Sequence, residues 1–190
     1  RLTYRDWADA YDSELLDEFG YQAPNAAVET LHKRLPSLDS VILDMGCGTG
    51  LVGELLHNLG YRHLDGLDLS PEMLEKANAR GVYRTLGEAD LTETLEIERI
   101  YDAVICVGVF SHQRNQAFDL VKLFAGLKAD GVLVATVNGK GWRDIGWETL
   151  LEQSKRKHGF QIEEILDIPY LTRQDIPGKL LMIRPKPQSR

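Results

Sequence analysis

The sequence is poor in cysteine, in positive charge and in long apolar runs, and each shortage excludes a class of protein. It has only two cysteines, Cys47 and Cys106, which argues against a disulfide-stabilised secreted scaffold. Asp and Glu number 29 against 22 Lys and Arg, and the resulting net charge of −7 disfavours nucleic-acid partners. No apolar stretch approaches the roughly 18 residues needed to span a bilayer. We therefore expect a cytoplasmic protein without a membrane or nucleic-acid partner.

The composition is that of a folded globular protein. Hydrophobic residues make up 43% of the chain and charged residues 27%, a balance not typical of disordered proteins. A length of 190 residues fits one domain, which we place at 1–184 with a disordered tail at 185–190. The chain opens on Arg1 without an initiator Met or a visible signal peptide, which is consistent with a native start further upstream.

The first 36 residues read as two helices. Aromatic and aliphatic residues recur at helical spacing between Tyr4 and Phe19, and Gly20 is a plausible stop. Pro24 suits the first position of a second helix that runs to about Leu35.

From residue 40 onward, strands alternate with helices. The predicted strands are 41–43, 63–68, 83–86, 101–107 and 131–137, and the predicted helices are 51–59, 71–80, 115–127 and 147–157. This alternation is typical of βαβ units and a largely parallel sheet. Two final strands, 160–168 and 179–183, have no helix between them, so we expect them to pair antiparallel.

A glycine-rich turn follows the first of these strands, in the run Asp44-Met45-Gly46-Cys47-Gly48-Thr49-Gly50. Alternate glycines allow a ligand to approach the backbone closely, and the following helix presents its N-terminus. Asp68 ends the next strand, 18 residues beyond Gly50, where a carboxylate can bind both hydroxyls of a ribose. Asp90 follows the third strand, where an acid could accept from an adenine amino group. Together these residues predict an adenosine-binding site.

The spacing of the loop distinguishes between adenosine ligands. Dinucleotide-binding domains use G-x-G-x-x-G, whereas this loop reads G-x-G-x-G. Asp44 at the mouth of the loop would repel a pyrophosphate but would suit a cation. S-adenosylmethionine has adenosine, an ammonium group and no phosphate. A nicotinamide oxidoreductase and a non-catalytic S-adenosylmethionine-binding module remain as alternatives.

Three segments resemble the signature of class I S-adenosylmethionine-dependent methyltransferases, in the order and spacing of that family. They are 42–50, 66–74 and 101–106. Two further stretches, 4–12 and 107–112, resemble the Williams–Beuren-region methyltransferase-like proteins and their bacterial small-molecule relatives. One departure is Lys128-Ala129-Asp130-Gly131, a turn before a strand where the class often has Lys-Pro-Gly-Gly.

The resemblance implies an α/β, Rossmann-like fold. Its seven-stranded sheet would have the order 3-2-1-4-5-7-6 and be mostly parallel, with strand 7 antiparallel and helices on both faces. Residues 1–36 would supply N-terminal lid helices, and residues 40–184 would form the Rossmann-like core. We expect the first helix to become ordered when it docks over the cofactor.

The resemblance also implies roles for individual residues. Asp44 and the backbone of Gly46 and Gly48 would hold the methionine part, Asp68 the ribose, and Leu69, Met73 and Asp90 the adenine; Leu91 and Val107 complete the predicted cofactor contacts. Tyr11 could face the sulfonium through a cation–π contact. His112, after the fourth strand, is the candidate general base. Trp142 and Trp147 could either pack or line an acceptor pocket.

The expected reaction is methyl transfer to a small-molecule acceptor by in-line displacement at the sulfonium methyl. No Asn/Asp-Pro-Pro-aromatic motif follows the fourth strand, which disfavours amino groups of nucleic-acid bases, and no Asp cluster suggests a metal site. A protein or peptide methyltransferase is the main alternative within this fold.

Overall fold

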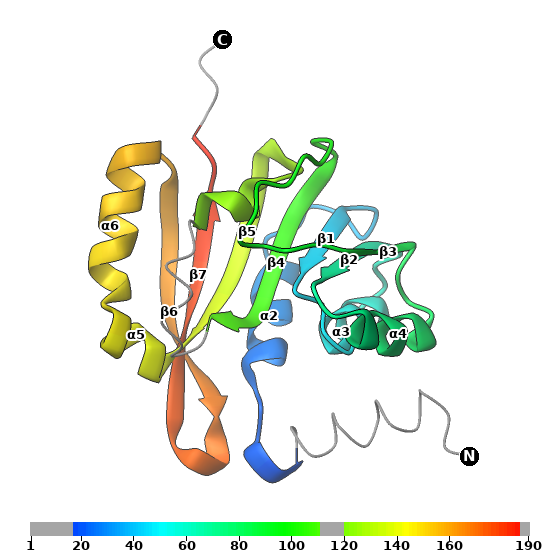
Figure 1. Cartoon of the computed structure of the whole chain (residues 1–190), viewed down its shortest axis with the longest axis horizontal. Coiled ribbons are helices and arrows are strands. Elements are labelled where there is room, and N and C mark those ends of the chain that lie inside the picture. Colours follow the sequence, from blue (N-terminus) through cyan, green and yellow to red (C-terminus); the bar gives the residue numbers. More distant parts are fainter. Residues whose placement is uncertain (1–16, 111–119, 187–190) are drawn as a thin grey trace.

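A seven-stranded sheet organises the chain, with the strand order β3-β2-β1-β4-β5-β7-β6 (Figure 1). The structure, a computed structural model, describes residues 17–110 and 120–186. Strands β1 to β5 run parallel to one another, and β7 is antiparallel to both β5 and β6. The predicted fold class, strand order and antiparallel final strand are therefore confirmed.

Helices and strands alternate along most of the described chain. The strands are β1 (Val41–Met45), β2 (His63–Asp68), β3 (Thr85–Glu88), β4 (Tyr101–Phe110), β5 (Leu127–Asn138), β6 (Gln161–Leu171) and β7 (Ile176–Arg184). The α-helices are α2 (Ala23–His32), α3 (Leu51–Asn58), α4 (Pro71–Arg80), α5 (Gly139–Ile145) and α6 (Trp147–His158). Two short 3₁₀ helices, η3 (Leu120–Phe124) and η4 (Thr172–Gln174), complete the set.

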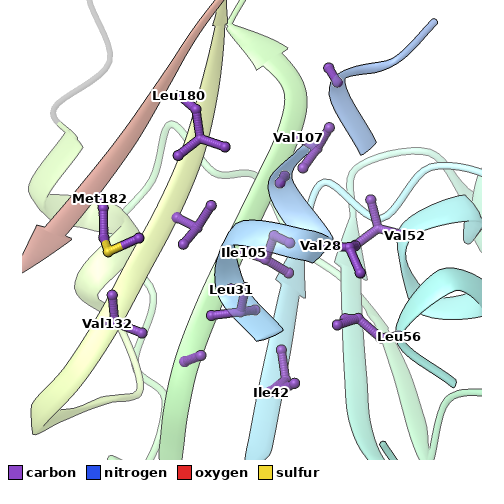
Figure 2. Close-up of a cluster of buried hydrophobic side chains, with 14 of the residues drawn as sticks. Val28, Leu31, Ile42, Val52, Leu56, Ile105, Val107, Val132, Leu180 and Met182 are labelled. Atoms are coloured by element: carbon purple, nitrogen blue, oxygen red, sulfur yellow. The ribbon is translucent and has the colours of Figure 1, made fainter. Parts of the chain in front are cut away.

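Successive residues of a strand point to opposite faces of the sheet. Helices cover both faces, so the side chains of both faces are buried. Ile42 belongs to a core under α2 and α3, whereas its neighbour Leu43 belongs to a second core under η3 and α6. Figure 2 shows the first core, with Val28 and Leu31 of α2 lying over the strands. The two cores hold the carboxyl ends of β1, β2 and β4 at one edge of the sheet, where open α/β folds bind ligands.

Local signals set several helix ends. The side chain of Ser70 accepts from the Met73 N–H at 3.3 Å and caps α4, which ends at Gly81 with φ +67°. Asn138 caps α5 in the same way, accepting from the Lys140 N–H at 2.9 Å.

The predicted helix over 115–127 is wrong in its described part. Residues 120–124 form only a 3₁₀ turn, Gly126 adopts φ +74°, and Leu127 already pairs with Tyr101 of β4. Regular pairing resumes at Val132, so the predicted turn at 128–131 is an irregular stretch inside β5.

Other boundaries also differ from the sequence prediction. The third strand begins at Thr85 instead of at residue 83. The second helix ends at His32, short of Leu35. The sequence analysis missed α5 because two glycines, Gly139 and Gly141, weaken its helical pattern.

Some predictions lie outside the described residues. Most of the predicted first helix falls within residues 1–16, and most of the predicted tail falls within residues 187–190. The lid and the disordered tail therefore stay predictions.

Candidate cofactor site

Two adjoining cavities open at the carboxyl edge of the sheet. The larger, of about 420 Å³, is lined by Tyr21, Pro24, Gly46, Cys47, Gly48, Thr49, Leu51, Val52, Asp68, Ser70, Met73, Val107, Gly108 and Val109. The smaller, of about 210 Å³, is lined by Gly46, Asp68, Leu69, Asp90, Leu91, Thr92, Val109 and Phe110. Because Gly46, Asp68 and Val109 line both, the two cavities meet beside the glycine loop.

Most backbone N–H groups of the glycine loop are bonded within the protein. The N–H groups of Gly46 and Cys47 both donate to the Leu67 carbonyl, at 2.7 and 3.0 Å, and the Gly50 N–H donates to the Cys47 carbonyl at 2.8 Å. A phosphate-binding loop instead points such groups at its ligand. The arrangement therefore disfavours a pyrophosphate ligand.

Gly48 is the point where the loop lies open to the larger cavity. Its φ is +53°, and a Cβ built on it would meet no atom within 4 Å. At Gly46, with φ +75°, a Cβ would instead lie 2.3 Å from the side chain of Val109. Gly48 thus leaves room for a ligand to approach the backbone, whereas Gly46 lets the loop pack on β4.

Asp68 lies at the junction of the two cavities. Its carboxylate accepts from the backbone N–H of Gly48 at 2.8 Å and from that of Ser70 at 2.9 Å, one bond to each oxygen. Each carboxylate oxygen can accept a further hydrogen bond. Asp68 is therefore held in place by the backbone and can still accept from two hydroxyl groups of a ligand.

Asp44 lies behind the loop and is not one of the residues that line either cavity. Its side chain is buried, Oδ2 accepts from the Tyr83 hydroxyl at 2.6 Å, and Oδ1 has no hydrogen-bond partner in the described part of the chain. Burial raises the pKa of Asp44 to about 7, the Tyr83 hydrogen bond opposes this rise, and the negative charge of Asp68 adds to it. The site therefore contains a buried acid that has no positive partner among residues 17–110 and 120–186.

The smaller cavity combines apolar walls with one acid. Leu69, 59% exposed, and Leu91 line it beside Asp90. The Thr92 hydroxyl and N–H donate to Asp90 Oδ1 at 2.6 and 2.8 Å, and these bonds lower the pKa of Asp90. A flat, partly polar ring is the kind of ligand that such a cavity fits.

The predicted residues divide between the two cavities. Leu69, Asp90 and Leu91 line the smaller one, whereas Met73 and Val107 line the larger one. Met73 and Leu69 were both expected to contact the adenine, but they line different cavities. Tyr11 and His112 lie outside the described residues.

Tyr21 and Gly108 also line the larger cavity and were not predicted from the sequence. Tyr21 packs edge-on against Tyr170, with ring centroids 5.5 Å apart. A Cβ on Gly108, whose φ is +77°, would lie 2.4 Å from the Tyr21 hydroxyl. A glycine within an apolar strand often marks such a close approach, so Gly108 did carry a signal. Tyr21 lies between two predicted helices, and no sequence pattern marks it as a site residue.

The tryptophans after β5 pack together. Trp142 and Trp147 stack with centroids 6.5 Å apart, and Trp147 meets Phe110 edge-on at 5.0 Å. Neither tryptophan lines the two cavities. Of the two interpretations of this pair, packing is the one that these contacts support.

Two searches of the described residues found nothing. Within 17–110 and 120–186, no group of three or more His, Cys, Asp or Glu side chains could hold a metal ion. None of the helices in these ranges is long and apolar enough to cross a membrane.

Comparison with known proteins relates part of the chain to a family. Residues 42–131 match the family model for the methyltransferase domain. Human methyltransferase-like protein 27 is 41% identical over 115 residues, which are 57% of this chain and 45% of that protein. The ubiquinone biosynthesis O-methyltransferase of Xylella fastidiosa is 31% identical over 142 residues, which are 68% of this chain and 56% of that protein.

A solved structure agrees in fold. Magnesium protoporphyrin IX methyltransferase from Synechocystis, crystallised with bound S-adenosylmethionine, superposes with a TM-score of 0.69 at 21% identity, over 90% of this chain and 82% of that one.

The matched segment is a methyltransferase domain, and the predicted class, that of S-adenosylmethionine-dependent class I methyltransferases, is confirmed. The chain covers about half the length of the curated relatives named above.

Proposed function

We propose that the chain binds S-adenosylmethionine across the two cavities and transfers its methyl group to a small-molecule acceptor. The observation that carries this proposal is the position of Asp68, fixed by two backbone N–H groups where the cavities meet. A ribose carboxylate has to lie between an adenine pocket and a methionine pocket, and Asp68 has such a position.

The residues present fit the cofactor in charge and shape. Asp90, Leu69 and Leu91 would receive the adenine, and the open backbone at Gly48 would lie beside the methionine part. Asp44 would supply negative charge behind the loop, opposite a ligand with an ammonium and a sulfonium. The internally satisfied loop donors fit a ligand without phosphate.

S-adenosylmethionine supplies a methyl group on a positively charged sulfur, which an acceptor can displace in line. The chain's own task is to hold donor and acceptor in that line and to exclude water. Such positioning can lower the activation free energy by about 7–11 kcal/mol. Tyr21, Met73 and Val107 line the larger cavity and would shape its acceptor side. His112 stays the candidate base for an acceptor that enters protonated.

A small acceptor is favoured by the likeness to the Xylella ubiquinone biosynthesis O-methyltransferase. To test it, the protein would be incubated with methyl-labelled S-adenosylmethionine and a cell extract separated into small-molecule and protein fractions. We expect label in the small-molecule fraction and none with Asp68→Ala.

Label in the protein fraction alone would overturn the small-molecule proposal in favour of a protein or peptide methyltransferase. Cofactor binding with no label in either fraction would indicate a non-catalytic binding module.

A further inference from the structure

Tyr83 links the buried acid of the site to the start of a helix. Its hydroxyl donates to Asp44 Oδ2 at 2.6 Å and accepts from the backbone N–H of Gly53 at 3.2 Å. Gly53 belongs to the first turn of α3, where backbone N–H groups have no partner within the helix. A Cβ on Gly53 would lie 2.3 Å from the Tyr83 hydroxyl, so the glycine makes room for this contact.

We propose that Tyr83 is a positioning residue that keeps the Asp44 carboxylate ionised and oriented, and thereby sets the affinity of the site for a ligand with an ammonium group. This inference rests on the proposed function, because S-adenosylmethionine and S-adenosylhomocysteine both carry an ammonium group.

The surroundings of Asp44 leave Tyr83 as the group that favours its charged form. Burial and the negative charge of Asp68, at the end of β2, both raise the pKa of Asp44, and only the Tyr83 hydrogen bond opposes them. The other titratable neighbours are the thiols of Cys47 in the loop and Cys106 in β4. Their pKa values are raised first by burial and further by the charge of Asp44.

The nearby cation is already engaged. Arg80 of α4 donates to the Thr49 carbonyl at 2.6 Å and pairs with Glu54. Within the described residues, Asp44 therefore has a hydrogen-bond donor in Tyr83 but no positive side chain paired with it. Since Asp44 acts electrostatically on Cys47 and Asp68, which both line the larger cavity, its charge is felt where a ligand would bind.

Removing the Tyr83 hydroxyl should make Asp44 harder to ionise. In Tyr83→Phe the carboxylate loses its donor, and a lost hydrogen bond to a charged group moves a pKa by about one unit or more. A ligand with an ammonium group binds more tightly to the ionised form of Asp44, so its affinity should rise with pH through the pKa of Asp44, which is about 7, and then level off. In the variant this rise should occur at higher pH.

The experiment is isothermal titration of S-adenosylhomocysteine at several pH values between about 5.5 and 8.5, which span the pKa of Asp44 of about 7. For Tyr83→Phe we expect the midpoint of the rise in affinity to lie about one pH unit higher than in the wild type. The affinity should be up to about tenfold weaker near pH 7 and should recover toward the wild-type value as the pH rises. Tyr101→Phe is the matched control, since it removes the 3.0 Å bond from another tyrosine hydroxyl to a buried acid, Asp65, outside the site. Its pH profile should match that of the wild type.

An unchanged midpoint in Tyr83→Phe, or a loss of affinity equal at every pH, would overturn the proposal, because a purely packing residue would give those results. Asp44→Asn provides a second test that needs no change at Tyr83. Its affinity should not vary with pH around 7, and a wild-type profile in this variant would overturn the proposal as well. A wild-type protein that binds no S-adenosylhomocysteine at any pH would instead overturn the proposed function, and this inference with it.

Discussion

The backbone N–H of Gly48 donates to Oδ2 of Asp68 at 2.8 Å, which joins the glycine loop to the end of β2 at the boundary between the two cavities. One carboxylate thus fixes the conformation of the loop and faces the ligand. Changes at either residue should therefore affect both the loop conformation and ligand binding.

Replacing Asp68 by alanine should reduce the affinity for S-adenosylhomocysteine by about a hundredfold or more. The ribose would lose two charge-assisted hydrogen bonds, each worth about 1.5–3 kcal/mol. Isothermal titration measures the loss. Glu72→Ala is the control, because it removes a nearby exposed carboxylate that is bonded to the Ser70 hydroxyl and lines neither cavity. A loss of less than about threefold in Asp68→Ala, well under 1.4 kcal/mol, would show that Asp68 is not the ribose ligand.

Gly48→Ala should weaken cofactor binding through the methyl group that it places in the larger cavity. Gly81→Ala is a matched control, since both glycines have positive φ, +53° and +67°, and open space around a built Cβ. Each substitution should cost about 1–2 kcal/mol of stability from left-handed backbone strain. Only Gly48→Ala should also lower the affinity, by about tenfold on the assumption that the methyl group displaces one good contact. Equal affinities in the two variants would mean that the ligand does not approach Gly48.

The pair of Asp65 and Arg84 should make stability depend on pH on the acid side. Burial raises the pKa of Asp65, but the hydrogen bonds from Arg84 and Tyr101 outweigh it, and the net pKa is lowered. A lowered pKa stabilises the fold above the unfolded value of about 3.9, and that stability is lost as the pH falls through the folded value.

Arg84→Gln should therefore reduce stability by about 1–3 kcal/mol at pH 7, a range that allows for the 38% exposure of the Arg84 side chain. Urea unfolding at several pH values measures the difference from wild type, which should shrink below about pH 4. A difference that stays constant with pH would contradict the ion-pair account.

Much of the fold could be predicted because local residues determine many helix and strand boundaries. Pro71 and Gly81 bound α4, and the alternation of apolar strands with amphipathic helices is typical of a parallel sheet. The errors arose where tertiary pairing decides. Leu120 and Leu123 have helical spacing but pack from a 3₁₀ turn, and Leu127 joins β5 because Tyr101 pairs with it.

The bounds of the final hairpin also depend on tertiary pairing that local sequence does not reveal. The predicted strand ended at Ile168, yet β6 continues through Pro169 to Leu171. Proline is tolerated there because β6 is an edge strand, and sequence alone does not say which strand lies at an edge.

The site could be predicted as far as its motifs reach. The topology brings three of its residues to one edge of the sheet, because each lies at or just after the end of a strand. They are Gly48, Asp68 and Asp90. The partner of Asp44 could not be predicted, because Tyr83 reads as an apolar strand residue. Its hydroxyl meets Asp44 only because β3 begins two residues later and Gly53 leaves space.

The most direct test of the central claim is isothermal titration of the protein with S-adenosylhomocysteine and, separately, with NAD. The loop N–H groups, already bonded within the protein, and the buried Asp44 carboxylate behind them predict micromolar binding of S-adenosylhomocysteine and no measurable binding of NAD. Micromolar binding of NAD with no heat from S-adenosylhomocysteine would contradict the account.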